Sequence, residues 1–274
     1  MTDDQLDLFA GSGRPADRPQ VRERTPLAWH TADDDTVIAA IAEADLIDAP
    51  AVIAEAGSRR LARAIPVLEA VCWCFSGFGV EQMVPEQSAA FDAMAAIGGS
   101  EAAQAVARLI AQRAVQGPTL KVAAAAAARL DASLPADTVM QLLRHDDPDI
   151  RTNACRCARR WPATIPLLID LLDDLRSQVG IAAACALGRL GRAEARPVLL
   201  RLLQDHPSSE IVDAIVAVAD EDCVVLLGRI ARLAPDQAGA MLDALDAIDH
   251  PLARTVADSL RAHEDPGRID ETDR

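Results

Sequence analysis

The chain has 274 residues, of which half are hydrophobic and only 3% are aromatic, with no tyrosine. This composition excludes a wholly disordered chain, and its aromatic poverty favours closely packed helices over a β-sandwich. A net charge of −15 disfavours bulk binding to nucleic acids or anionic membranes, because both would repel it.

The N-terminal residues 1–33 predict a disordered arm, since most of it is rich in Gly, Pro, Arg and Asp. Leu6, Leu8 and Phe9 stand out there, because a free chain end gains nothing from apolar side chains left in water. Two interpretations remain open: these side chains cap the first unit of the fold, or another protein binds them.

The pentad Gln5, Leu6, Asp7, Leu8 and Phe9 resembles the bacterial sliding-clamp-binding motif, whose preferred form is Gln-Leu-Ser/Asp-Leu-Phe. The resemblance implies that the DNA polymerase sliding clamp is a partner. It also implies that Leu8 and Phe9 are the main anchors in an apolar pocket of that clamp. In an extended peptide, Leu6 would cover the lip of the pocket, Gln5 would orient the backbone and Asp7 would stay in water.

Two ladders of residues reveal an internal repeat of 28 to 33 residues. Such a period predicts stacked helix pairs. The polar ladder consists of Arg108, Gln141, Asp170, Arg201, Arg229 and Asp258, and the apolar ladder of Ile97, Leu130, Trp161, Leu190, Val218 and Ile248. Helices are expected near 36–45 and 60–75, and then in pairs near 86–97/100–113, 119–130/136–144, 149–160/163–172, 177–189/194–204, 209–218/222–232 and 237–247/251–262.

The repeat resembles the short bacterial form of the HEAT family, most clearly in AAACALGRLGRAEARPVLLRLLQD at 182–205. The resemblance covers roughly residues 85–262. It implies an all-α, right-handed α-solenoid of about six to seven stacked helix pairs over residues 34–262. Residues 263–274 are expected to form a disordered acidic tail. HEAT-like stacks mostly serve as protein-binding scaffolds, so an unidentified protein is the expected partner of the solenoid.

A mildly basic stretch interrupts the acidic chain, because residues 140–205 hold ten Arg or Lys against eight Asp or Glu. We interpret it as a secondary surface that contacts an acidic protein or, weakly and indirectly, DNA emerging from a clamp. The alternative is a solvated helix face whose arginines pair with neighbouring aspartates. The surface would consist of Arg144, Arg151, Arg156, Arg159, Arg160, Arg192 and Arg196.

No catalytic, metal or cofactor site is predicted. The pairs Cys72/Cys74 and Cys155/Cys157 have a spacing that points their sulfurs to different helix faces, so buried structural thiols are expected. Some HEAT-like stacks are DNA-base glycosylases that use aromatic residues. Here Trp161 occupies a core slot of the repeat, and only Trp29, in the arm, is expected to be free.

The sequence therefore predicts a cytoplasmic, non-enzymatic adaptor with no membrane partner. The longest apolar run, residues 122–128, is too short to span a bilayer, and no signal peptide is visible. Two alternatives stay open, a general scaffold whose N-terminus caps the first repeat and a HEAT-like DNA-base repair glycosylase.

Overall fold

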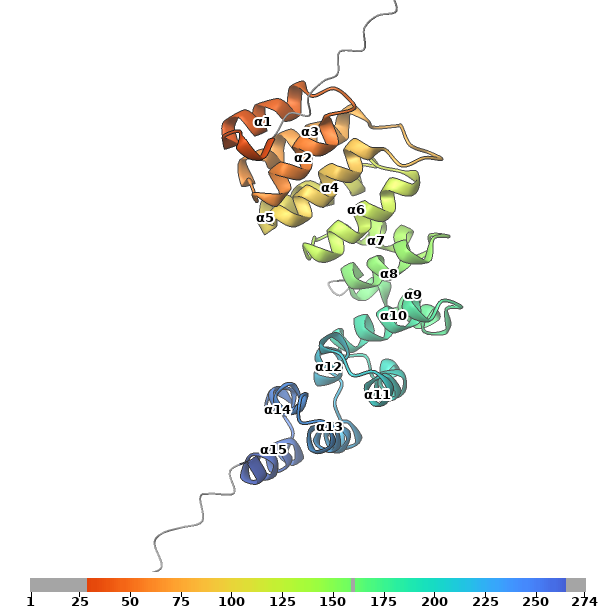
Figure 1. Cartoon of the computed structure of the whole chain (residues 1–274). Coiled ribbons are helices and arrows are strands. Elements are labelled where there is room, and N and C mark those ends of the chain that lie inside the picture. The colour runs from red at the N-terminus through yellow and green to blue at the C-terminus, as the bar shows by residue number, and fades with distance from the viewer. Residues whose placement is uncertain (1–28, 159–160, 265–274) are drawn as a thin grey trace, which may run out of the picture.

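The computed structural model describes residues 29–158 and 161–264, and every regular element in these ranges is a helix. The helices form a stack of antiparallel pairs that runs from α1 at one end to α15 at the other (Figure 1). This arrangement confirms the predicted α-solenoid of six to seven helix pairs. After α1 (Asp34–Glu43), the pairs are α2 (Ala49–Ser58) with α3 (Ile65–Cys74), α4 (Pro85–Ile97) with α5 (Gly99–Ala111), α6 (Gly117–Arg129) with α7 (Ala136–Leu143), α8 (Pro148–Cys157) with α9 (Ile165–Asp170), α10 (Ser177–Arg189) with α11 (Arg196–Asp205), α12 (Ser209–Val216) with α13 (Glu221–Leu233), and α14 (Ala238–Ala247) with α15 (Pro251–Glu264).

The first helices of the pairs form one continuous layer. Each packs on the next along the whole stack, from α2 on α4 through to α12 on α14. Small buried side chains, such as Ala123 and Ala127 of α6 and Ala183 of α10, let these backbones approach closely. None of the described helices is both long and apolar enough to cross a membrane.

Helix α2 lies where the sequence analysis predicts none, and that part of the prediction is wrong. Pro50 occupies the first turn of α2, where a missing backbone N–H costs nothing. Near the other end of α2, a Cβ atom on Gly57 would lie 2.8 Å from the Cα atom of Ala93 in α4. Gly57 therefore permits close packing of α2 on α4.

The same kind of contact joins α10 to α12, and it predicts opposite effects for two glycine substitutions. A Cβ atom on Gly188 would lie 2.6 Å from the carbonyl oxygen of Ala214, whereas one on Gly239 in α14 would meet nothing within 4 Å. We expect Gly188→Ala to lower the free energy of unfolding by about 1–3 kcal/mol. Gly239→Ala should raise it by a few tenths to about 1 kcal/mol through helix propensity. Urea denaturation of both variants checks this, and a stabilising Gly188→Ala would contradict it.

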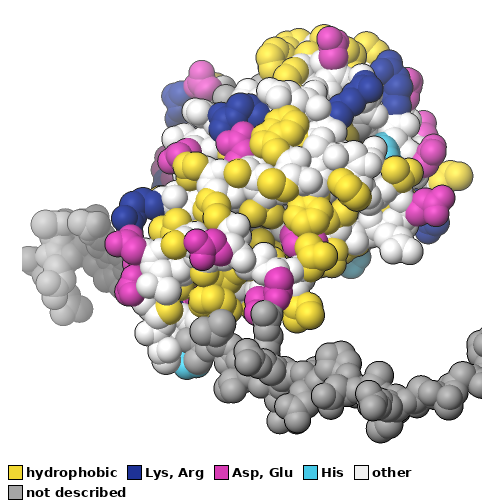
Figure 2. Space-filling view, turned by 90° about the horizontal axis from the view of Figure 1, so that it is seen from above, with side chains coloured by type: hydrophobic (Ala, Val, Ile, Leu, Met, Phe, Trp, Pro, Cys, Tyr) yellow, Lys and Arg dark blue, Asp and Glu magenta, His cyan; other side chains and the backbone are white. Residues whose placement is uncertain are grey.

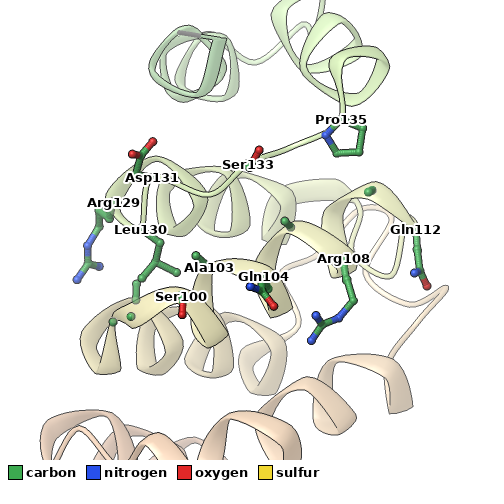
Figure 3. A pocket seen from close by; sticks show the side chains of 15 residues that line it. Ser100, Ala103, Gln104, Arg108, Gln112, Arg129, Leu130, Asp131, Ser133 and Pro135 are labelled. Atoms are coloured by element: carbon green, nitrogen blue, oxygen red, sulfur yellow. The ribbon is translucent and has the colours of Figure 1, made fainter. Parts of the chain in front are cut away.

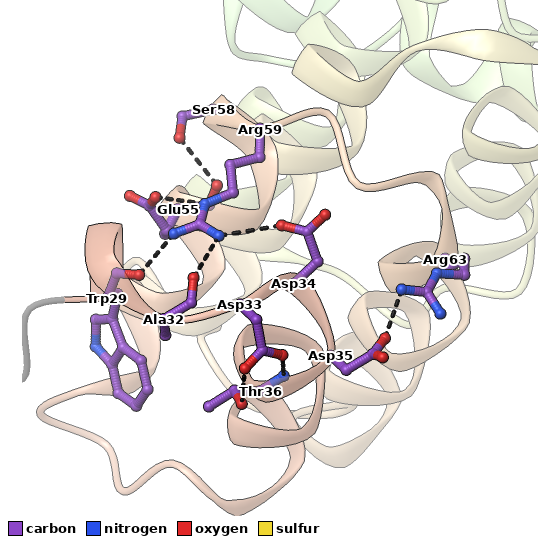
Figure 4. Close-up of polar contacts among 10 residues, drawn as sticks. All are labelled: Trp29, Ala32, Asp33, Asp34, Asp35, Thr36, Glu55, Ser58, Arg59 and Arg63. Carbon is purple, nitrogen blue, oxygen red and sulfur yellow. Dashed lines mark hydrogen bonds and ion pairs between the residues drawn. The ribbon is translucent and has the colours of Figure 1, made fainter.

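Residues 29–34 are fastened to the C-terminal end of α2 by Arg59 (Figure 4). Its guanidinium donates to the carbonyl oxygens of Trp29 at 2.7 Å and Ala32 at 2.8 Å. The same group pairs with Asp34 at 3.0 Å and Glu55 at 2.7 Å. The Trp29 side chain is half-buried against the core. The expectation of a free Trp29 is therefore wrong, because Arg59 and the core hold this residue in place.

Candidate interaction surfaces

The predicted clamp-binding residues Gln5, Leu6, Asp7, Leu8 and Phe9 lie outside the described residues, as do Arg159 and Arg160 of the predicted basic surface. The remaining arginines of that surface are described, and most of them bind carboxylates or carbonyl oxygens of the solenoid itself.

Arg151 of α8 makes the most buried of these contacts. Its guanidinium binds the Asp174 carboxylate through Nε at 3.0 Å and Nη2 at 3.1 Å. Nη1 donates to the carbonyl oxygens of His145 and Asp146, both at 2.8 Å. The side chains of Arg151 and Asp174 are only 16% and 9% exposed. Arg151 therefore joins α8 to the α9–α10 connection and is not available to a phosphate group.

The other arginines lie nearer to solvent. Arg144 donates only to the carbonyl oxygen of Met140, at 3.4 Å, and forms no ion pair with a described residue. The ion pairs of the rest are Arg156 with Glu210 at 3.5 Å, Arg192 with Glu194 at 2.6 Å, and Arg196 with Asp220 at 2.8 Å. Their positive charge is largely compensated in place. This arrangement favours the interpretation of a paired helix face over that of a DNA-contacting surface.

A groove of about 760 Å³, here called the α5–α7 groove, lies between α5 and the connection from α6 to α7 (Figure 3). Its floor is formed by Ala103, Ala107 and Ala111, which recur at every fourth position of α5 and so share one helix face. Leu130 and Pro135 close the opposite side. The groove exists because α5 and α7 do not pack closely on each other, although α3 packs on α5 and α6 packs on both α4 and α5.

The rim of this α5–α7 groove is polar. Arg108 is engaged by Glu69 of α3, with nitrogen–oxygen distances of 2.9 and 2.7 Å. The side chains of Arg129, Gln104 and Gln112 make no hydrogen bond or ion pair with any described residue. An apolar floor with free amides and a free cation at its edges suits an apolar peptide that carries negative charge. Sequence reasoning missed this groove, although the alanine stripe of α5 was a signal for it.

A second groove, of about 570 Å³, crosses the layer of first helices. Residues from α4, α6, α8, α10 and α12 line it, which shows that this layer is hollowed across several pairs. Its charges are nearly balanced, because Lys121 pairs with Asp149 and Arg156 with Glu210, and Asp92 adds one negative charge. Balanced charge on a concave helical surface suits a protein partner better than a polyanion.

Apolar side chains also emerge outside the grooves, and two such places lie in the N-terminal part of the stack. Phe78 and Val80, 63% and 67% exposed, lie in the α3–α4 loop, which projects from the stack (Figure 1). At the N-terminal end of the stack, Leu46 and Ile47 are exposed in the α1–α2 connection. Figure 2 looks onto that end and shows hydrophobic side chains spread among charged ones. Both places leave apolar surface available for contact with another chain segment.

Five of the six cysteines are buried and therefore unreactive, and Cys74 is the exception. Burial raises the pKa of Cys72, Cys155 and Cys157 to about 12 and that of Cys185 to about 11, so these thiols stay protonated. The expectation of buried thiols is wrong only for Cys74, which is exposed. No group of His, Cys, Asp or Glu side chains suited to a metal ion occurs among the described residues.

Trp161 has the structural role expected from its place in the apolar ladder. Its ring packs against the core, and its indole N–H donates to the carbonyl oxygen of Leu134 at 2.7 Å. Trp161 therefore ties the α8–α9 turn to the α6–α7 turn and does not present its ring to a nucleobase.

The comparison with family models agrees with this architecture. Residues 136–219 match the family model of HEAT repeats. No curated protein matches the chain. Two solved structures of engineered proteins are similar: one is 18% identical (TM-score 0.49; 84% of this chain and 77% of the other), and the second is 16% identical (TM-score 0.33; 86% and 98%). HEAT repeats point to a non-catalytic scaffold that binds other proteins. Residues 136–219 of the chain are thus similar to HEAT repeats, in keeping with the stacked helix pairs of the fold.

Proposed function

We propose that this protein is a bacterial, cytoplasmic adaptor without enzymatic activity. Its solenoid holds a protein partner, and residues 5–9 dock on the DNA polymerase sliding clamp. The observation that carries the proposal is the pentad QLDLF, which agrees with the clamp-binding motif at every position. Residues 10–28 separate it from Trp29, the first residue fastened to the solenoid, so the pentad lies at a distance along the chain from the folded body.

The surface of the solenoid supports a protein partner. Both grooves combine apolar side chains with charges of both signs, and the arginines of the basic stretch are mostly paired. Protein interfaces use such mixed surfaces, whereas a phosphate backbone requires a run of uncompensated cations. On this proposal DNA is reached only indirectly, through the clamp, and any direct contact is weak.

Binding of a labelled peptide of residues 1–15 to the purified clamp of the source organism tests the proposal. We expect saturable binding with a Kd near micromolar, as for a small single-motif contact. The Leu8→Ala/Phe9→Ala peptide should bind at least about tenfold more weakly, because it lacks the two apolar anchors. In the full chain, deletion of residues 1–10 should abolish clamp binding and leave helix content and Tm unchanged. Clamp binding that survives this deletion would refute the proposal.

The Tm of the chain without residues 1–10 tests the first alternative, and an activity assay tests the second. If the N-terminus caps the first repeat, its removal exposes apolar area and lowers the Tm. If the protein is a glycosylase, it releases a damaged base from duplex DNA in an assay without clamp, and Arg144→Ala reduces DNA binding in a salt-dependent way.

A further inference from the structure

The α5–α7 groove has a volume of about 760 Å³, and no described residue fills it. We propose that residues 3–9 of the same chain dock in this groove. The proposal goes beyond clamp docking and does not rest on it, because it concerns a contact within one chain. If both contacts form, the segment has two alternative binding sites, one in the clamp and one in its own solenoid.

The chain enters the described structure at the edge of the stack onto which this groove opens. Arg59 holds Trp29 at the turn between α2 and α3. The groove is lined by Gly98 at the α4–α5 turn and by residues 130–135 at the α6–α7 turn. Successive first helices pack side by side along the stack, and each is followed by an antiparallel second helix (Figure 1). The turns within successive pairs therefore lie along one edge.

The intervening chain is long enough for this contact. Two steps between packed helices, from α2 to α6, amount to about 20 Å. Residues 10–28 can span up to roughly 60 Å when extended. The segment can therefore reach the whole length of the groove.

The apolar side chains of the segment match the groove floor. Leu6, Leu8 and Phe9 are large, whereas the floor is made of alanines that leave room above them. Gly98 and Gly99 line the entrance, and a Cβ atom on either would meet nothing within 4 Å. Large side chains over a floor of small ones bury apolar area without displacing any part of the solenoid.

The charges match as well. Residues 1–9 contain Asp3, Asp4 and Asp7 and no Lys or Arg. Most of this acidic protein repels such a segment. The groove rim carries Asp131 and two arginines, of which Arg108 is paired with Glu69 and Arg129 has no ion pair with a described residue. The free side-chain amides of Gln104 and Gln112 can also bind the peptide backbone.

Because both partners belong to one chain, the segment is present at the groove at an effective concentration of about millimolar. A contact with a Kd of about millimolar between separate molecules is therefore about half populated within the chain, which stabilises the fold too little for deletion of residues 1–10 to move the Tm measurably. Docking in the groove and docking on another protein compete for the same side chains. By linkage, a protein that captures the segment also opens the groove to a different ligand.

Photocrosslinking within the full chain tests the proposal. Leu6 is replaced by the photoreactive p-benzoylphenylalanine, which leaves Leu8 and Phe9 in place, and no clamp is added. We expect intramolecular crosslinks to residues 98–112 and 129–135, identified by mass spectrometry. Adding Leu8→Ala/Phe9→Ala should lower their yield by about tenfold. Crosslinks to the α1–α2 end, or a lack of intramolecular crosslinks, would overturn the proposal.

Two charge-reversing substitutions, one on the groove rim and one far from it, form a matched pair of variants. Arg129→Glu reverses the free charge on the rim and should lower the crosslink yield several-fold. Arg254→Glu makes the same charge change on α15, far along the stack from the groove, and should leave the yield unchanged. Equal crosslink yields in the two variants would show that the charge of Arg129 does not attract the segment, and would overturn the proposed site.

Hydrogen exchange of the unmodified chain gives an independent readout. Amides at residues 99–111 and 131–134 should exchange about two- to tenfold more slowly than in the Leu8→Ala/Phe9→Ala chain. Identical exchange would contradict docking. Because none of these measurements contains the clamp, a failure here leaves clamp docking untouched, and a failure of clamp binding leaves this contact untouched.

Discussion

Gly117→Ala is expected to lower the free energy of unfolding by about 2–4 kcal/mol. Gly117 begins α6 with a φ of +56°, a conformation that costs any other residue energy. A Cβ atom there would also lie 2.1 Å from the carbonyl oxygen of Gly79 and 2.4 Å from that of Val80. Both contacts are with backbone atoms, so the α3–α4 loop would have to move away from α6.

That loop has further anchors which the movement would weaken. The Val84 N–H donates to the buried hydroxyl of Thr119 at 2.9 Å, and the Gln116 amide donates to the carbonyl oxygen of Phe78 at 3.3 Å. The buried Gln87 amide binds the carbonyl oxygens of Cys72 and Ala114 at 2.9 and 3.0 Å. The loop thus closes the junction between the first two pairs and α6, and its displacement costs more than one hydrogen bond.

Gly99→Ala is the control, because Gly99 also has a positive φ, +84°, but a Cβ atom there would meet nothing within 4 Å. Gly99→Ala should therefore lower the free energy of unfolding by only about 1–2 kcal/mol, which is the cost of a positive φ for a residue with a Cβ atom. Urea denaturation measures both variants. Equal losses would show that the contact of Gly117 with the loop contributes nothing.

The stack of helix pairs could be predicted from the sequence because it arises from a pattern of residues that repeats along the chain. All six residues of the polar ladder lie in second helices, from Arg108 in α5 to Asp258 in α15. The apolar ladder follows the ends of the first helices, as Leu130 and Leu190 show. Helix α2 was not predicted because its unit departs from this period and because its glycine, Gly57, is explained only by packing on α4.

The surfaces could be predicted less well, because they depend on distances between elements that are remote in sequence. The alanine stripe of α5 is visible in the sequence, yet it lines a groove only because α7 does not pack closely on α5. The arginines of the basic stretch are also visible. Their availability depends on partners such as Glu210 and Asp220, which belong to α12 and to the turn that follows it.

The ion pair of Arg151 with Asp174 carries the second large effect. We expect Asp174→Asn to lower the free energy of unfolding at pH 7 by about 2–4 kcal/mol, because it leaves a mostly buried guanidinium without a counter-charge. The matched control is Asp249→Asn. Asp249 is 97% exposed and pairs at 3.0 Å with the exposed Arg254, so its loss should cost less than about 0.5 kcal/mol.

The loss of stability caused by Asp174→Asn should also depend on pH, and the direction of this dependence follows from the pKa of Asp174. Desolvation alone raises the pKa of Asp174, but the hydrogen bonds from Arg151 and the Arg176 N–H, with the charges of both arginines, lower it on balance. Because the pKa is lower in the folded state, the stabilisation is complete well above the ordinary Asp pKa of about 3.9. It is lost as the pH falls through the folded-state pKa. The difference between the wild type and Asp174→Asn should therefore narrow as urea denaturation is repeated from pH 7 down towards pH 3. A difference that stays constant over this range would show that the carboxylate acts through its shape and not through its charge.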